Sequence, residues 1–212
     1  MRILCIGDSN TWGFDPNTGL RHKNRWTRQL MALRPQDEII EEGMNGRTFA
    51  FDDPFTPGRN GLRALDMLLM SHEPVDLVVV MLGTNDLKTF FNARAKAVAR
   101  GARTFLRQIK NPFLYRYKEP DILMVAPILL GEAIAQTEGE CGDFDEESLC
   151  QSKSLGREIQ SVCEELGVAF LNAADFAHAS PVDNVHMDET NHGRLAQAIH
   201  QTIEERKKGE GQ

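Results

Sequence analysis

The sequence places a serine directly after its first apolar segment. Residues 1–6 form a short apolar run, and Gly7, Asp8 and Ser9 follow it. An apolar run that ends in a polar turn indicates a buried strand, and residues just beyond the carboxyl ends of parallel strands line the ligand crevice of α/β sheets. Ser9 is therefore a candidate nucleophile. An Asp-Ser pair in a turn can also serve only as a helix cap, so the assignment depends on partners elsewhere in the chain.

A nucleophilic serine needs a base, and His186 is the best placed of the six histidines. It ends the loop segment 183–186, which begins with Asp183, so one turn can present both side chains. The carboxylate can then hold the imidazole in the orientation that lets Nε2 take the serine proton. Chance also produces this spacing, and His192 is a second candidate that lies inside a helical pattern. The chain order Ser9, Asp183, His186 suits a catalytic triad built across a parallel sheet.

Acyl transfer also needs hydrogen-bond donors for the oxyanion that forms when the nucleophile attacks. Gly46 and Asn85 each follow an expected strand, as Ser9 does. The backbone N–H groups of Ser9 and Gly46 and the side-chain amide of Asn85 are candidate donors. Each has an ordinary structural alternative, since Asn-Gly is a frequent turn and Asn85 can cap the next helix. Asp8 is interpreted as a turn-stabilising residue, because Asp183 has the better relation to the base.

Strand-like and helix-like segments alternate along the whole chain. We expect strands at 1–6, 38–42, 76–82, 121–126 and 168–171, and helices at 26–33, 62–71, 95–109, 148–166 and 189–206, followed by a frayed tail at 207–212. This alternation predicts one α/β domain over residues 1–212, with a five-stranded parallel sheet between two layers of helices. The turns after the first three strands then converge on one edge of the sheet.

Composition narrows the class of protein. A formal net charge of −7 argues against nucleic-acid binding, and no apolar run approaches the roughly 20 residues that span a bilayer. No leader segment is visible, and the four cysteines form no Cys-x-x-Cys pair, so we expect a cytoplasmic protein without a disulfide framework or a metal site. The acidic segment 138–147 lacks a regular calcium-ligand spacing and is expected to be a solvated rim.

Four short blocks together resemble the SGNH, or GDSL-type, hydrolases. The blocks occur in the family's order and are Gly7-Asp8-Ser9, Gly46, Gly83-Thr84-Asn85-Asp86 and Asp183-Asn184-Val185-His186. The resemblance implies a flavodoxin-like α/β/α fold and a serine-esterase mechanism without a cofactor. It implies Ser9 as nucleophile, Asp183 and His186 as the rest of the triad, and Ser9, Gly46 and Asn85 as the oxyanion hole.

A narrower resemblance points to the bacterial arylesterase/acyltransferase subgroup. It is carried by the segments 11–13, 25–27, 41–48, 52–54 and 81–86. It implies a small-molecule ester substrate with a short acyl group, acyl transfer to alcohols, and a homo-oligomer, with an octamer as one form. Asn10 stands where the subgroup usually has leucine, which we expect to alter only the packing of the turn. Asn45, before the glycine of the second block, is expected to make the entrance more polar.

The substrate-binding residues are the least determined by the sequence. Trp12 is expected to wall the acyl pocket, with an ordinary core position as the alternative, and Ile128 can reach the pocket from the end of the fourth strand. Asn45 completes this set. Within the enzyme class, a carbohydrate O-acetyl esterase shares the same blocks. Outside it, the alternative is a ligand-binding module with a vestigial site.

Overall fold

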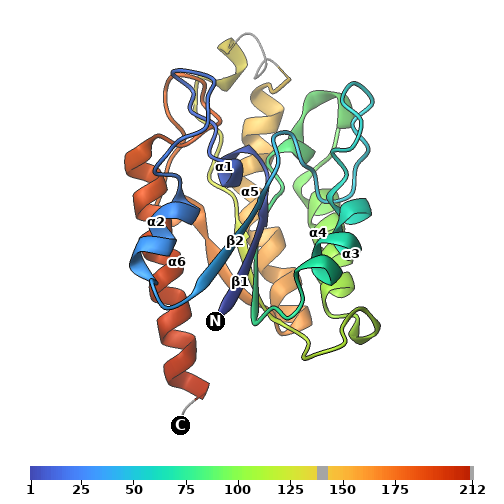
Figure 1. The fold of residues 1–212 in the computed structure, drawn as a ribbon. Coiled ribbons are helices and arrows are strands. Elements are labelled where there is room, and N and C mark those ends of the chain that lie inside the picture. Colours follow the sequence, from blue (N-terminus) through green and yellow to red (C-terminus); the bar gives the residue numbers. More distant parts are fainter. Residues whose placement is uncertain (138–142, 211–212) are drawn as a thin grey trace.

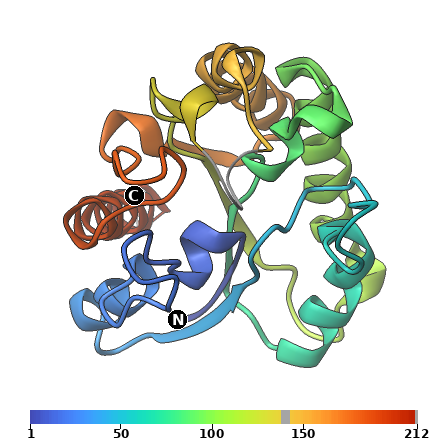
Figure 2. The same ribbon diagram turned by 90° about the horizontal axis from the view of Figure 1, so that it is seen from above.

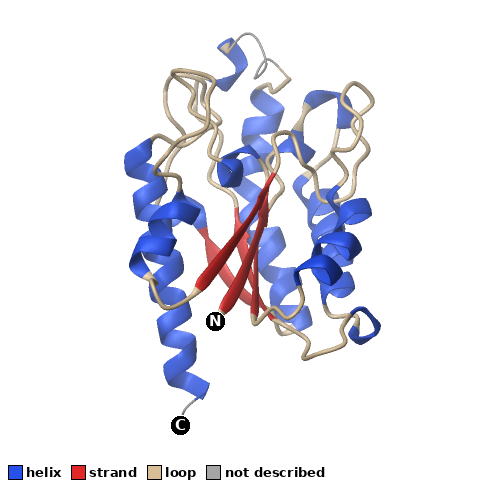
Figure 3. Ribbon diagram, in the orientation of Figure 1, coloured by secondary structure: helices blue, strands red, loops and turns tan. Residues whose placement is uncertain are grey.

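The computed structural model of the protein describes residues 1–137 and 143–210. Glu138 and Glu140 of the acidic segment, and Cys141, lie outside these described residues. In the described chain, five parallel strands form one sheet (Figures 1 and 3). The strands are β1 (Arg2–Gly7), β2 (Glu38–Gly43), β3 (Leu77–Met81), β4 (Asp121–Ala126) and β5 (Ala169–Asn172).

The strand order is β2-β1-β3-β4-β5, and each neighbouring pair is parallel. The chain moves from β1 to β2 on one side and then crosses to β3 on the other. Loops diverge at such a reversal and leave a crevice beyond the carboxyl ends of the strands. The expected α/β/α architecture with flavodoxin-like order is confirmed. The reversal places the turn after β1, which carries Ser9, between the turns after β2 and β3.

Helices cover both faces of the sheet, as the view from above shows (Figure 2). The helices of the described chain are α1 (Ser9–Trp12), α2 (Trp26–Leu33), α3 (Gly61–His72), α4 (Ala95–Ile109), α5 (Glu146–Leu166) and α6 (Glu189–Glu210). Short 3₁₀ turns lie at Asn85–Leu87, Thr89–Phe91, Pro112–Leu114, Ile134–Gln136 and Ala173–Asp175. Helices α2 and α6 pack together on one face, and α3, α4 and α5 cover the other.

The sheet has an apolar cluster on each face, because side chains along each strand point alternately to the two faces. Ile3 and Cys5 of β1 belong to the apolar cluster that α2 and α6 close, whereas Leu4 and Ile6 belong to the cluster beneath α3, α4 and α5. Successive side chains of a strand point to opposite faces, so a continuously apolar strand is buried on both. No helix in the described part of the chain has the length and apolar character needed to cross a membrane.

The largest differences from the expected helix ends are at the start of α5 and the end of α6. Helix α5 begins at Glu146 because the Asp145 side chain accepts the Ser148 N–H at 2.8 Å and forms a capping box with it. The expectation of a frayed tail is wrong as far as Glu210, to which α6 extends. Lys207 and Lys208 lie in its last turn, where positive charge is favourable beside the helix dipole.

Candidate active site

The turn after β1 presents Ser9 as the first residue of α1. Asp8 caps this helix, since its carboxylate accepts the backbone N–H of Asn10 at 3.0 Å. A Cβ on Gly7 would lie 2.0 Å from the Thr11 hydroxyl oxygen, so no side chain fits where the strand turns into the helix. Ser9 is buried but lines a cavity. The tight turn therefore fixes the serine at the sheet edge, as expected from its position after the strand.

The loop before α6 brings Asp183 and His186 to the same place. His186 Nε2 lies 2.8 Å from Ser9 Oγ, and His186 Nδ1 lies 2.5 Å from Asp183 Oδ2. The other carboxylate oxygen accepts the backbone N–H groups of Val185 at 3.0 Å and His186 at 2.9 Å. Burial by itself would raise the pKa of Asp183, but the hydrogen bonds from His186 hold that pKa below its ordinary value. An ionised Asp183 accepts from Nδ1–H, which leaves Nε2 as the acceptor for the serine hydroxyl.

Asn10 joins the nucleophile turn to the loop that carries His186. Its Nδ2 donates to the Val185 carbonyl at 3.2 Å, and its Oδ1 accepts the Met187 N–H at 3.0 Å. These residues stand immediately before and after His186. In the described chain, the two bonds of Asn10 and the Ser9–His186 pair are the hydrogen bonds between residues 8–13 and 183–187. The expectation that Asn10 alters only the packing of the turn is therefore wrong.

Replacing Asn10 with leucine is expected to lower kcat by about 10- to 100-fold with little change in KM, because small misplacements of a base are costly. Esterase assays per titrated active site would measure this loss. Asn191→Leu is the matched control, since Asn191 is also buried and also donates one bond and accepts another, to Asp188 and from His178. Equal per-site kcat values for wild type and Asn10→Leu would contradict the prediction.

Three candidate oxyanion donors lie around one cavity, which we call the inner cavity. Ser9, Gly46, Asn85 and His186 all line this space of about 450 Å³. Gly46 has a φ of 76°, in the left-handed region that glycine adopts without strain. In the described chain, the N–H groups of Ser9 and Gly46 donate to no other protein group. Asn85 Nδ2 donates to the Arg47 carbonyl at 3.1 Å, so its second hydrogen is left for another acceptor.

Buried polar side chains form hydrogen bonds that hold together the turns after β1, β2 and β3. The Arg47 guanidinium donates to the Gly7 carbonyl at 3.0 Å, and both oxygens of Asp86 accept the Phe49 N–H at 3.1 Å. Burial raises the pKa of Asp8 to about 6 and that of Asp86 to about 7. The sequence marks Arg47 and Asp86 only as members of the polar blocks. Their bracing role depends on contacts between loops that no local pattern predicts.

Of the three expected substrate-binding residues, only Asn45 lines the inner cavity. Trp12 lies instead over the end of β2, where its backbone approaches Gly43 so closely that a Cβ there would be 2.2 Å from the Trp12 nitrogen. The Arg21 guanidinium covers the Trp12 ring at 5.3 Å. Ile128 is 4% exposed and packs in the core beneath α2 and α6. The expectations for Trp12 and Ile128 are therefore wrong.

Phe14 is a site residue that the sequence does not indicate. Its ring centroid lies 4.4 Å from that of His186, and its N–H donates to the Ser9 carbonyl at 3.0 Å. It lines the inner cavity. The short helix α1 turns the chain between Ser9 and Gly13. The aromatic residue that contacts His186 is therefore Phe14, two positions after Trp12.

Charged side chains also line the inner cavity. Lys88 Nζ lies 3.2 Å from Asp143 and 3.8 Å from Asp53, and Arg59 lines the same space. Asp143 thus forms a wall of the cavity, whereas the acidic segment was expected to be only a solvated rim. Among the residues that the structure describes, no group of three or more histidine, cysteine, aspartate or glutamate side chains could hold a metal ion.

His192 is a buried structural residue in this fold. It is fully buried, and its Nδ1 accepts the Trp26 N–H at 3.3 Å. Burial lowers its pKa to about 3, and the nearby His22 adds to the effect. Because Nδ1 accepts a backbone hydrogen bond, the folded protein holds His192 in its neutral form.

The free energy of unfolding is expected to fall as the pH is lowered from about 6.5 towards 3, owing to His192. In that window the unfolded chain binds a proton at this position that the folded chain does not, so acid favours unfolding. Denaturant titrations at several pH values would show a shallower acid loss for His192→Asn than for wild type. His178→Asn, at an exposed histidine, should keep the wild-type slope. Identical slopes for wild type and His192→Asn would contradict the assignment.

Comparison with known proteins gives a match to one family model and to several solved structures. Residues 5–202 match the model of the GDSL-like lipase/acylhydrolase family. A putative arylesterase from Agrobacterium tumefaciens str. C58 is 38% identical, with a TM-score of 0.84 over 96% of this chain and 98% of that one. Est24, a carbohydrate acetylesterase from Sinorhizobium meliloti, is 33% identical, with a TM-score of 0.88 over 95% and 97%. The native M. smegmatis aryl esterase is 32% identical, with a TM-score of 0.88 over 96% and 98%. None of the curated proteins compared with the chain matches it.

Proposed function

The chain belongs to the GDSL-like lipase/acylhydrolase family and is an esterase of that family, and from this premise we propose that it hydrolyses short acyl esters through a triad of Ser9, His186 and Asp183. The observation that carries the proposal is the unbroken chain of hydrogen bonds from Asp183 through His186 to Ser9. A nucleophile, a base and an orienting carboxylate in this relation are the parts of a serine hydrolase.

The first half of the reaction forms an acyl-enzyme. Ser9 Oγ attacks the ester carbonyl while His186 Nε2 takes the hydroxyl proton, and the Asp183 carboxylate stabilises the imidazolium. The tetrahedral oxyanion accepts hydrogen bonds from the N–H groups of Ser9 and Gly46 and from the Asn85 amide. The intermediate collapses when the carbon–oxygen bond to the alcohol breaks, and His186 returns the proton to the departing oxygen.

The second half releases the acyl group. Water attacks the acyl-serine as His186 again takes a proton, and collapse of the second intermediate frees the acid and restores Ser9. An alcohol that enters in place of water gives acyl transfer by the same steps. The scheme needs no cofactor, because His186 carries both protons, the first from Ser9 to the departing alcohol oxygen and the second from water back to Ser9.

Labelling with a fluorophosphonate probe tests the proposal directly. A nucleophilic serine forms a covalent phosphonyl adduct, which mass spectrometry of a proteolytic digest would place on the peptide containing Ser9. The rate of phenyl acetate hydrolysis by the same preparation should fall in proportion to the fraction of protein that is labelled. A folded protein that is neither labelled nor active on simple esters would overturn the proposal and favour a ligand-binding module with a vestigial site.

A carbohydrate O-acetyl esterase is the second candidate, and the polar inner cavity favours it. Asn45, Arg59 and Lys88 place amide, guanidinium and ammonium donors around the space beside Ser9. Under this alternative the alcohol is a sugar that lies in the inner cavity, where such donors suit its hydroxyl groups better than an unsubstituted aryl ring. Comparison of kcat/KM on acetylated sugars and on phenyl acetate separates the two candidates. A much higher kcat/KM for the acetylated sugars would identify the protein as a carbohydrate O-acetyl esterase.

A further inference from the structure

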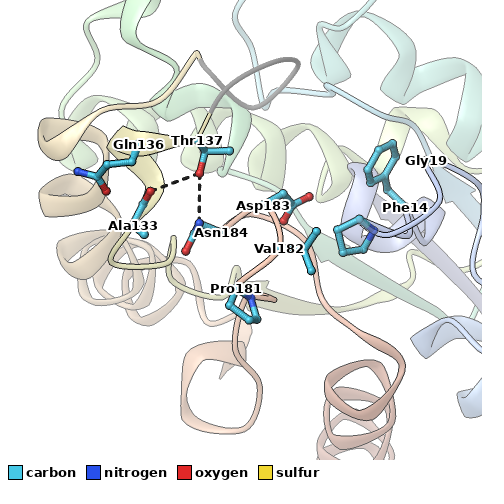
Figure 4. A pocket seen from close by; sticks show the side chains of 10 residues that line it. Phe14, Gly19, Ala133, Gln136, Thr137, Pro181, Val182, Asp183 and Asn184 are labelled. Carbon is cyan, nitrogen blue, oxygen red and sulfur yellow. Dashed lines mark hydrogen bonds between the residues drawn. The ribbon is translucent and has the colours of Figure 1, made fainter.

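A second cavity adjoins the inner one at Phe14, and we call it the outer cavity (Figure 4). Its volume is about 740 Å³, compared with about 450 Å³ for the inner cavity. In Figure 4, residues 181–184 lie between Ala133 and Gln136 on one side and Phe14 and Gly19 on the other. Phe14 lines both cavities and therefore lies between them.

The two cavities differ in chemistry. The inner cavity carries the charged side chains of Arg59, Lys88 and Asp143. The outer cavity is lined mainly by uncharged residues, of which Phe14, Pro16, Ala133, Pro181 and Val182 are apolar and Gln136, Thr137 and Asn184 are polar. Its one ionisable lining residue in the described chain is Asp183, whose carboxylate is already bonded to His186. An uncharged ring would therefore find apolar faces there beside uncharged hydrogen-bonding groups.

The proposed reaction directs the two halves of an ester to opposite sides. The oxyanion must lie towards Gly46 and Asn85, and the departing oxygen must lie within hydrogen-bond reach of His186 Nε2. The acyl group then points away from His186, into the inner cavity. The alcohol begins beside His186, where the Phe14 ring packs against the imidazole at 4.4 Å. A longer alcohol therefore continues across Phe14.

We propose that the outer cavity is a subsite for the distal part of the alcohol, and that it takes an uncharged, ring-bearing group. The inference rests on the proposed function and adds to it which half of the substrate has room to extend. Phe14 is suited to this position because its backbone is held by the Ser9 carbonyl while its ring contacts the base. Apolar rings gain from burial against such aromatic and proline faces.

Two exposed residues allow each cavity to be obstructed separately. Val182 is 53% exposed and lines the outer cavity, and the exposed Thr56 lines the inner one. Val182→Trp and Thr56→Trp would be assayed on phenyl acetate, phenyl butyrate and 4-benzyloxyphenyl acetate. Butyrate extends the acyl side, and the benzyloxy group extends the alcohol side. Phenyl acetate reports whether the triad is intact in each variant.

We expect Val182→Trp to lower kcat/KM for 4-benzyloxyphenyl acetate at least 10-fold, with the values for phenyl acetate and phenyl butyrate within about twofold of wild type. Thr56→Trp should show the reverse selectivity and lower the value for phenyl butyrate. The inference is overturned if Val182→Trp leaves the benzyloxy ester unaffected or lowers the butyrate ester instead. Failure of the proposed function is distinct, because wild type would then hydrolyse none of the three esters and would resist the fluorophosphonate.

Discussion

Alanine at position 9 is expected to remove ester hydrolysis almost completely, lowering kcat by about a million-fold, the loss found when a triad serine is removed from a serine protease. Ser9 Oγ lies at hydrogen-bond distance from the base, 2.8 Å from His186 Nε2. Without that oxygen no acyl-enzyme forms, and binding with oxyanion stabilisation alone gives a small residual rate. The measurement is kcat on phenyl acetate, together with loss of fluorophosphonate labelling.

The fold should tolerate Ser9→Ala, because the change removes one hydroxyl and creates almost no cavity. Ser152→Ala is a matched control, since Ser152 is also buried and its Oγ donates to the Leu149 carbonyl at 2.8 Å within α5. Both variants should unfold at similar denaturant concentrations, and Ser152→Ala should keep wild-type activity. A folded Ser9→Ala enzyme with more than about a hundredth of wild-type activity would contradict the assignment.

Local patterns were sufficient to predict the architecture. Strands β1, β3 and β4 coincide with short apolar runs, and α2 and α4 begin and end at the predicted residues. The turn after β1 was predictable because Gly7 and Asp8 meet strict local demands of space and capping. Asp183 and His186 were predictable as a pair because their spacing of three places both on one turn.

Contacts between distant segments explain where the sequence analysis failed. Asn10 is an ordinary turn residue by local criteria, and its importance comes from carbonyl and N–H groups about 175 positions away in the chain. Phe14 lines the inner cavity and Trp12, two positions earlier, does not, because the direction of each side chain depends on how α1 packs over β2. Ile128 follows β4 as expected, and its burial depends on α2 and α6, which the sequence near it does not describe.

Asn85→Ala is expected to lower kcat by about 100- to 1,000-fold while changing KM much less. One amide hydrogen of Asn85 is bonded to the Arg47 carbonyl at 3.1 Å, which fixes the direction of the amide, and Asn85 lines the inner cavity beside Ser9. The second hydrogen can therefore meet the oxyanion without reorganisation. A donor of this kind acts mainly when charge develops, so the loss should fall on kcat for both acylation and deacylation.

Stability must be separated from catalysis in this variant, because Asn85→Ala also leaves the buried Arg47 carbonyl without its side-chain donor, at a cost of about 1–3 kcal/mol. Asn60→Ala is the control, since buried Asn60 donates to the Ala50 carbonyl at 2.8 Å and does not line the inner cavity. Both variants should lose stability, and only Asn85→Ala should lose kcat per titrated site. Asn85→Asp should remain as slow as the alanine variant, because a carboxylate presents no hydrogen to the oxyanion and repels it. Rapid turnover by Asn85→Asp would show that position 85 supports the loop and leaves the oxyanion to the backbone donors of Ser9 and Gly46.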